Sequence, residues 1–382
     1  MGGAFLKRFI SIIILLSIIF SLSVPALADE TEISAHSAIL VCADTGDVLY
    51  EKNPGERMHI ASITKIMTAI LVIEHCRDLD SEVKIKPECC NIEGSSMYLE
   101  AGKTYTVKEL LLGMLLASGN DAAAALAGFV SGSTEKFARL MNDKARELGM
   151  TDSSFKNPHG LDEEGHYSTA RDMACLMSYC MKNENFRELS ACKAADIGDL
   201  TFVNHNKLLW NCEGCIGGKT GYTETAGRTL VSCAERGGMT LVCVTLGAPD
   251  DWNDHRTLYD LGFENYKETS FLHDDFSFAI PIISGAKSET SIVPENDICI
   301  CSKVEDMVIA RFELPRMLFA GAGEGEKAGV IKVFVNGRLA EKQNLVYTDN
   351  VTRDESLRLS IGERINRLIG RLLRPYYVEG EL

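Results

Sequence analysis

Residues 61–69 (ASITKIMTA) place a serine and a lysine three positions apart at the start of an apolar, helix-forming run. The run continues to Ile73 and is apolar on nearly every side, which predicts a buried helix. Positions i and i+3 share a helix face, so the Lys65 ammonium can lie beside the Ser62 hydroxyl. A lysine whose pKa is lowered by burial or by a second cation can take a proton from serine. The segment therefore predicts a nucleophilic serine on a rigid, buried mount.

The Ser-x-x-Lys spacing alone does not identify the nucleophile, because it recurs elsewhere in the chain. The other matches are Ser81/Lys84, Ser133/Lys136, Ser153/Lys156, Ser190/Lys193 and Ser284/Lys287. Two further motifs distinguish Ser62 from these: Ser118-Gly119-Asn120, after an apolar helical run, and Lys219-Thr220-Gly221, which opens a strand-like segment. In this order the three motifs are the signature of penicillin-binding proteins and serine β-lactamases.

Length, charge and the N-terminal residues limit the number of domains, the class of partner and the location of the protein. The 382 residues allow two domains, and a net charge of −15 argues against nucleic acid as a partner. Lys7 and Arg8 precede an apolar stretch that ends near an Ala26-Leu27-Ala28 cleavage site. This pattern predicts a signal peptide over residues 1–28, whose removal leaves −15 − 2 = −17. The alternative is an uncleaved anchor helix, and both interpretations predict an exported protein.

Cysteine and histidine offer no convincing metal site. The thirteen cysteines are odd in number and scattered, which is typical of buried small apolar residues rather than of a disulfide framework. Cys212 and Cys215 have metal or redox spacing, but no second Cys/His pair with matching spacing accompanies them. His159 and His166 are interpreted as loop histidines whose partners are backbone groups.

The order of helical and strand-like segments predicts a multi-domain α/β protein. Strand patterns at 37–41, 48–50, 228–234 and 239–246 enclose a helix-rich middle, so residues 29–267 form one domain with an antiparallel sheet and a helical subdomain. A connector is expected over 268–290, and a small all-β domain over 285–349, with a hairpin at Asn336-Gly337.

Two local features are expected in the helix-rich middle. Residues 80–105 are polar and should be irregular. Asp121 should cap the helix that follows it, since aspartate is favoured at that position.

The tail has a different composition from the rest of the chain. Residues 355–374 repeat leucine and isoleucine at helical spacing, with five arginines on the other side. A basic amphipathic helix is typical of a segment that lies on a membrane surface. The alternative is that it packs on its own protein or on a partner.

The residues that flank the motifs indicate a more specific family. The relevant segments are 61–65 (ASITK), 94–97 (GSSM), 118–121 (SGND), 157–161 (NPHGL) and 218–223 (GKTGYT). Together they resemble the low-molecular-weight penicillin-binding proteins, specifically the D-alanyl-D-alanine carboxypeptidases of the peptidase S11 family. The resemblance is dense over residues 31–265 and weaker through the β domain and tail. It implies a serine β-lactamase/transpeptidase-like fold for the first domain.

The resemblance also implies a role for each motif. Ser62 would attack the carbonyl between the two terminal D-alanines of a peptidoglycan stem peptide, with Lys65 as its base. Ser118 would relay a proton to the leaving amine, and Asn120 would hold Lys65 and the substrate amide. The remaining substrate-binding residues would be Lys219, Thr220, Gly221, Tyr222 and Thr223, of which the first two bind the terminal carboxylate.

Partners and location follow from the same resemblance. The oxyanion would lie between the backbone N–H groups of Ser62 and Tyr222. No metal or organic cofactor is required, and penicillins and other β-lactams should acylate Ser62. The enzyme would be exported and peripheral on the outer face of the cytoplasmic membrane, held there by the amphipathic helix.

Three other functions share the same motifs. A serine β-lactamase would hydrolyse its acyl-enzyme rapidly, in class A with a general-base glutamate, and no comparable glutamate motif lies between Ser118 and Lys219. A catalytically silent penicillin-binding scaffold or sensor would not need every motif residue. Transpeptidation would pass the same acyl group to an amine.

Overall fold

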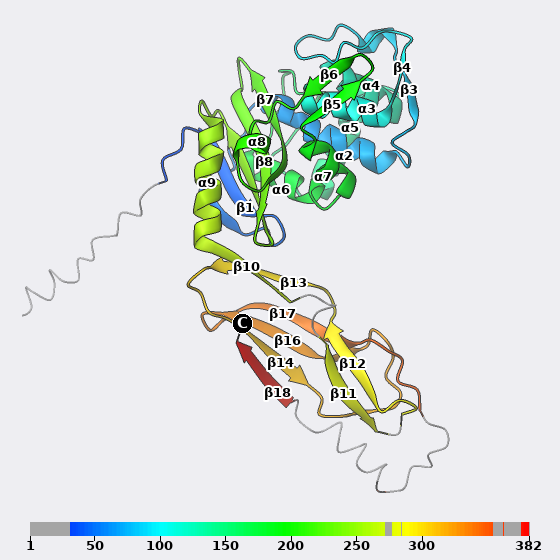
Figure 1. Ribbon diagram of the computed structural model, residues 1–382, viewed down its shortest axis with the longest axis vertical. Helices are drawn as coiled ribbons and strands as arrows, with labels where there is room; N and C mark the ends of the chain where they lie inside the picture. Colours follow the sequence, from blue (N-terminus) through cyan, green and yellow to red (C-terminus); the bar gives the residue numbers. More distant parts are fainter. Residues whose placement is uncertain (1–30, 272–276, 284, 354–361, 363–375, 382) are drawn as a thin grey trace, which may run out of the picture. The chain divides into compact units, whose positions relative to one another are not determined.

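A computed structural model describes residues 31–271, 277–283, 285–353, 362 and 376–381 (Figure 1). The signal peptide expected over 1–28 lies outside these residues, as does the amphipathic helix expected over 355–374 apart from Gly362, so both stay predictions. The chain divides after Ile33, and Ser34–Leu382 form one unit.

An antiparallel five-stranded sheet forms the centre of the first domain, in the order β2-β1-β9-β8-β7. Its strands are β1 (Ser37–Cys42), β2 (Val48–Lys52), β7 (Cys215–Thr223), β8 (Gly227–Arg236) and β9 (Met239–Leu246). Every residue of β1 and β9 is buried, because helices cover both faces of the sheet. α9 (Asp251–Asn265) packs on β8 and β9 from one side and α6 (Ala170–Cys180) from the other (Figure 1). The strands predicted at 37–41, 48–50, 228–234 and 239–246 are confirmed.

Helices make up the other half of this domain. They are the 3-10 turn η1 (Ala61–Thr64), α2 (Lys65–His75), α3 (Val107–Leu116), α4 (Asn120–Ser131), α5 (Thr134–Glu147), α6, α7 (Glu184–Ala191) and the short α8 (Leu208–Asn211). α2 is buried from Lys65 to Ile73 and contacts α3, α4, α5, α6 and α7. The buried helix predicted from the sequence is confirmed. The amine of Lys65 is buried with it.

Some local expectations of the helical region are wrong. Residues 80–105 are not wholly irregular: β3 (Glu82–Lys84) pairs with β4 (Thr104–Thr106), and the turn η2 (Pro87–Cys89) lies between them. Asp121 does not precede the next helix as a cap, because α4 already begins at Asn120. A further hairpin, β5 (Ala194–Ile197) with β6 (Leu200–Val203), follows α7.

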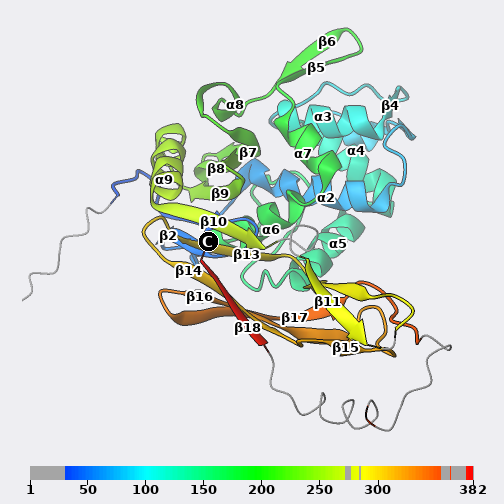
Figure 2. The ribbon, with the colours of Figure 1, turned by 60° about the horizontal axis from the view of Figure 1, so that its bottom comes forward.

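The described residues between Tyr266 and Arg353 are all-β, as predicted for this region, but the strands begin earlier than residue 285. The expected connector over 268–290 is wrong, because strands occupy much of it. The strands are β10 (Tyr266–Phe271), β11 (Phe278–Ile283), β12 (Glu289–Pro294), β13 (Ile298–Lys303), β14 (Val308–Leu314), β15 (Leu318–Phe319), β16 (Lys327–Val335), β17 (Arg338–Tyr347) and β18 (Tyr376–Glu381). Seven of them form one sheet in the order β15-β11-β12-β17-β16-β14-β18, while β10 pairs with β13. The C-terminal strand β18 runs along β14 (Figures 1 and 2).

A buried polar cluster joins α9 to the central sheet. The ring of His255 is fully buried, with Nδ1 2.7 Å from Ser232 Oγ and Nε2 3.0 Å from Thr245 Oγ1. Tyr259 completes the cluster through its hydroxyl, 2.7 Å from Ser232 Oγ. Burial lowers the pKa of His255 to about 3, so the folded protein keeps this ring neutral.

The buried imidazole makes folding stability depend on pH. Between the unfolded pKa of 6.5 and the folded value of about 3, the unfolded state binds a proton that folded His255 does not. The free energy of unfolding should therefore fall with decreasing pH in this window, by up to about 1.4 kcal/mol per pH unit for this group. Urea unfolding at several pH values should show a shallower slope for His255→Gln. An unchanged slope would contradict the assignment, and exposed His75→Gln serves as the control.

Candidate active site

Ser62 lies where η1 meets the edge strand β7. Gly221 makes this approach possible: a Cβ placed there would come within 2.9 Å of the Ser62 backbone nitrogen and 2.4 Å of Thr229 Oγ1. Thr229, opposite Gly221 on β8, donates its hydroxyl to the Ile60 carbonyl at 3.0 Å and so fixes the chain just before the serine. As β7 is an edge strand, one row of its backbone groups faces away from β8 and toward the nucleophile.

The amine of Lys65 contacts three oxygen atoms. Nζ lies 2.8 Å from Ser62 Oγ, 2.7 Å from Asn120 Oδ1 and 2.6 Å from the His159 carbonyl oxygen. Asn120 directs its Nδ2 to the Glu93 carbonyl at 2.6 Å, which leaves Oδ1 to accept. A neutral amine has two N–H donors and one lone pair, and two of these three partners can only accept. The lone pair of neutral Lys65 therefore faces the Ser62 hydroxyl.

Burial and charge favour this neutral amine. Lys65 is completely buried, and desolvation, followed by the nearby Lys219, holds the pKa of Lys65 well below its usual range. Desolvation also lowers the pKa of Lys219 to about 7. Lys219 is 1% exposed and donates to the carbonyl of Thr220 at 2.9 Å. The site thus contains a lysine poised to act as a base.

Asp121 organises the turn that carries Ser118 and Asn120. Its carboxylate accepts from Ser96 Oγ at 2.6 Å and from the backbone N–H groups of Met97 and Leu99 at 3.0 Å each. These bonds fasten the 96–99 segment to the first turn of α4. Ser118, with a φ of 61°, is held in the left-handed region that non-glycine residues seldom adopt, so the surrounding contacts must compensate for the strain.

The loop 157–161 closes the site behind Ser62. Its carbonyls at Pro158 and His159 accept from Thr68 Oγ1 and Lys65 Nζ, both at 2.6 Å, which binds the loop to α2. Gly160 has a φ of 87°, and a Cβ there would lie 1.9 Å from the Ala61 carbonyl oxygen. His166, beyond the loop, bonds the Thr64 hydroxyl at 2.9 Å and accepts from the Lys156 N–H at 3.2 Å. His159 Nδ1 accepts from the Leu161 N–H at 3.3 Å, so the predicted backbone partner is confirmed for His159, whereas His166 has a side-chain partner as well as a backbone one.

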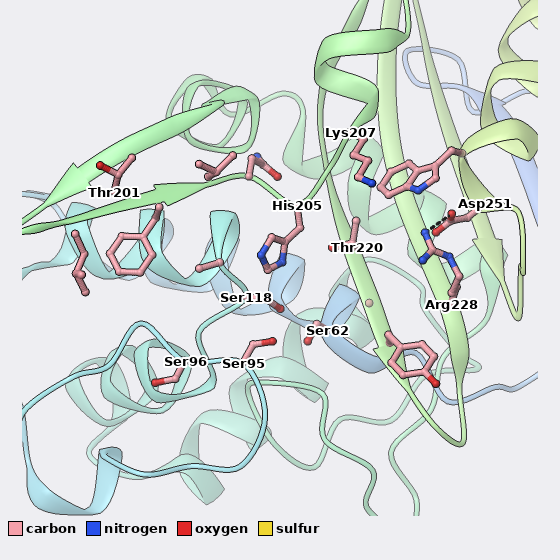
Figure 3. A pocket seen from close by; sticks show the side chains of 18 of the residues that line it. Ser62, Ser95, Ser96, Ser118, Thr201, His205, Lys207, Thr220, Arg228 and Asp251 are labelled. Atoms are coloured by element: carbon pink, nitrogen blue, oxygen red, sulfur yellow. Dashed lines mark hydrogen bonds and ion pairs between the residues drawn. The ribbon is translucent and has the colours of Figure 1, made fainter.

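A cleft of about 880 Å³ opens over these groups. Of the nine residues predicted for the site, Ser62, Ser118, Thr220, Gly221 and Tyr222 line it (Figure 3). Lys65, Asn120 and Lys219 lie beneath its surface, and Thr223 holds Asp162 at the end of β7, at 3.1 Å. The three motifs, far apart in sequence, therefore converge. No group of three or more His, Cys, Asp and Glu side chains arranged to hold a metal occurs among the described residues.

Several groups of the site were not predicted from the sequence. The His159 and Glu93 carbonyls could not be, because every residue type has a backbone carbonyl. His205, Lys207, Arg228 and Trp252 also line the cleft and were not predicted. The glycines at 94 and 160, next to the two carbonyls, were the available signal, since both adopt positive φ.

Comparisons with known proteins agree with this geometry. The model of the family Peptidase S11, described as D-alanyl-D-alanine carboxypeptidase, matches residues 24–250. This chain belongs to the peptidase S11 family. Among curated relatives, D-alanyl-D-alanine carboxypeptidase DacF of Bacillus subtilis is 36% identical over 321 residues, which cover 80% of this chain and 82% of the relative. DacC of Escherichia coli is 32% identical, with coverage of 85% and 86%.

Solved structures of the family extend the likeness to both domains. Penicillin-binding protein 5 of Haemophilus influenzae matches with a TM-score of 0.72 and 27% identity, over 84% of this chain and 98% of that one. The expected family and the transpeptidase-like α/β fold with a C-terminal β domain are thereby confirmed.

The close approach at Gly221 gives a direct test of this packing. Gly221→Ala should push β7 away from Ser62 and lower the rate of acylation by a penicillin by about 100-fold, the usual cost of misplacing reacting groups by about 1 Å. Stopped-flow acylation with a fluorescent penicillin would measure it. Gly55→Ala, where the added Cβ meets nothing within 4 Å, is the matched control. Equal rates for Gly221→Ala and wild type would refute the tight η1–β7 contact.

Proposed function

We propose that this chain removes the terminal D-alanine from peptidoglycan stem peptides through an acyl-enzyme on Ser62. The observation that carries the proposal is the contact of the buried Lys65 amine with Ser62 Oγ at 2.8 Å, beside the Ser118 and Lys219 motifs. Membership of a family of serine D-alanyl-D-alanine carboxypeptidases of the penicillin-binding type supports the same reaction.

Acylation would begin with transfer of the Ser62 proton to the Lys65 lone pair. Ser62 Oγ attacks the carbonyl carbon of the penultimate D-alanine, and the oxyanion accepts from the backbone N–H groups of Ser62 and Tyr222. The C–N bond then breaks, and the leaving amine takes a proton from Lys65 relayed by the Ser118 hydroxyl. The products of this step are an ester on Ser62 and free D-alanine.

Deacylation would use the same base. Lys65, neutral again, takes a proton from a water molecule that attacks the ester, and Ser62 recovers its proton as the peptide leaves. Asn120 fixes the amine through its Oδ1 at 2.7 Å during both steps. Lys219 supports the base electrostatically from below the cleft surface, and it would bind the carboxylate of the substrate together with Thr220, which lines the cleft.

A serine β-lactamase is the nearest rival function. Rapid hydrolysis of the acyl-enzyme in class A depends on a glutamate beside the nucleophile. None of the described residues that line this cleft is a glutamate, and Glu163, in the loop region behind Ser62, bonds Asn157 Nδ2 at 3.0 Å. Slow release of bound penicillin is therefore expected.

The membrane location also stays a proposal. The sequence of residues 1–28 supports export, and the arginine-rich 355–374 segment supports attachment to an anionic membrane surface. In the described part of the chain, no helix combines the length and apolar character needed to cross a bilayer.

The nucleophile can be tested against a decoy of the same spacing. Ser62→Ala should abolish covalent labelling by penicillin and lower D-alanine release by at least about 10⁴-fold. Mass spectrometry would locate the adduct and time its loss. Ser81→Ala, at another Ser-x-x-Lys match, should behave as wild type. Labelling that survives in Ser62→Ala would overturn the proposal, and rapid turnover of penicillin would favour a β-lactamase.

The role of Lys219 predicts a change in pH dependence. Its charge helps lower the pKa of Lys65, which must be neutral to act as the base. Lys219→Gln should therefore move the acid limb of the penicillin acylation profile to higher pH, by about one unit for loss of a neighbouring like charge. Lys219→Arg keeps the charge and should keep the limb in place. A profile that does not shift in Lys219→Gln would contradict this coupling.

A further inference from the structure

Two thiols from distant parts of the chain meet at the carboxylate of Glu268. Cys42 is the last residue of β1, and its Sγ donates to Glu268 Oε2 at 3.4 Å. Cys301 on β13 is the register partner of Glu268 on β10, so the two side chains project to the same face of this strand pair. The Cys301 thiol hydrogen-bonds the Cys42 thiol. Both cysteines are free, so the contact joins two thiols.

The connection to α9 brings Cys301 to this place. β10 begins at Tyr266, directly after α9, and α9 packs on the central sheet that contains β1. The N–H of Val304, at the end of β13, donates to the carbonyl of Asn265 at 2.9 Å. Both strands that carry the cluster are therefore fastened to the end of a helix that the first domain holds.

A third cysteine on the same strand has different partners. Cys299 precedes Cys301 by two residues, so it lies on the same face of β13. Its Sγ lies 3.8 Å from the hydroxyl of Ser270, which is its register partner on β10, and it also hydrogen-bonds Glu268. Cys299 is thus a closely matched control for Cys301.

We propose that Cys42 and Cys301 are a redox-active pair that closes into a disulfide between β1 and β13, with a low-molecular-weight disulfide as the oxidant. Thiols in hydrogen-bond contact need only a small change of side-chain torsion angles to reach bonding distance. Disulfides persist in exported proteins, and the signal peptide expected over residues 1–28 agrees with that setting. The inference does not depend on the proposed function.

Closure takes two thiol–disulfide exchange steps. Cys301, which is half-buried, loses its proton and attacks one sulfur of the external disulfide, which gives a mixed disulfide and releases one thiol. Cys42 then passes its proton to the Glu268 carboxylate and attacks the Cys301 sulfur, which releases the second thiol. The two cysteines are oxidised, the external disulfide is reduced, and the two protons end on the two released thiols.

Electrostatics give the two thiols different roles. The hydrogen bond that Cys301 donates holds the pKa of Cys42 below its ordinary value, so Cys42 is suited to attack the mixed disulfide. The same bond, followed by burial, raises the pKa of Cys301. Because Cys301 forms little thiolate at neutral pH, the first step limits the rate, and closure should take on the order of minutes to hours.

Mass spectrometry of the folded, full-length protein tests the pairing. The protein would be incubated with glutathione disulfide, its free thiols blocked with iodoacetamide, and the digest searched for linked peptides. Wild type should give a peptide pair joined through Cys42 and Cys301, lighter than the two reduced peptides by two hydrogen atoms. Cys301→Ala should give no link from Cys42, whereas Cys299→Ala should keep the wild-type link.

Thermal unfolding gives a second measurement that does not depend on digestion. A link between β1 and β13 constrains the unfolded chain, so oxidised wild type should unfold about 5 °C above reduced wild type. Cys301→Ala should unfold at the same temperature in both conditions, and Cys299→Ala should keep the wild-type difference. Each variant is compared with its own reduced form, so the cost of the substitution itself cancels.

Two results would overturn the pairing. One is a glutathione adduct on Cys301 that never closes onto Cys42. The other is a link from Cys42 to Cys299 instead of Cys301. A wild-type protein that gains no thermal stability while the linked peptide is present would show that the bond strains the fold, and would equally contradict a built disulfide site.

Discussion

One buried amine ties the chemistry to the fold. Lys65 Nζ contacts Ser62, Asn120 and the His159 carbonyl, which belong to three separate segments of the chain. Burial makes a charged amine costly there, and two obligate acceptors orient the neutral one toward the serine. The contacts that hold the site together are thus the ones that generate its base. A helix as deeply buried as α2 is required for both effects, since an exposed lysine would stay protonated at neutral pH.

The site also contains strained backbone on both sides of the nucleophile. Ala61 and Ser118 have φ values of 49° and 61°, which cost free energy for residues other than glycine. Hydrogen bonds outside the reacting groups compensate for this strain. The Thr229 hydroxyl donates to the Ile60 carbonyl, and the Asp121 carboxylate accepts from the segment 96–99. These bonds fix the hydroxyls before substrate arrives, so little reorganisation is needed during the reaction.

The sequence predicted what depends on local spacing and missed what depends on tertiary contact. The Ser62–Lys65 pair and the buried helix follow from helical periodicity, and the strands β8 and β9 from their apolar runs around a turn. Asp121 was expected to cap a helix, yet its bonds to Met97 and Leu99 decide its place. Residues 268–290 lack a clear alternating pattern, and pairing of β10 with β13 and of β11 with β12 makes them strands. The place of Arg228 in the cleft could not be predicted, because it depends on the packing of β8 beside α9, where Arg228 pairs with Asp251.

The second lysine beneath the cleft has a physical reason. A carboxylate that entered the cleft unpaired would raise the pKa of Lys65, because an anion nearby favours the charged amine. The base would then be lost when the substrate bound. A buried cation opposes this shift: after desolvation, the charge of Lys219 is the second cause that holds the pKa of Lys65 down. Lys219 therefore favours the neutral amine that takes the proton of Ser62.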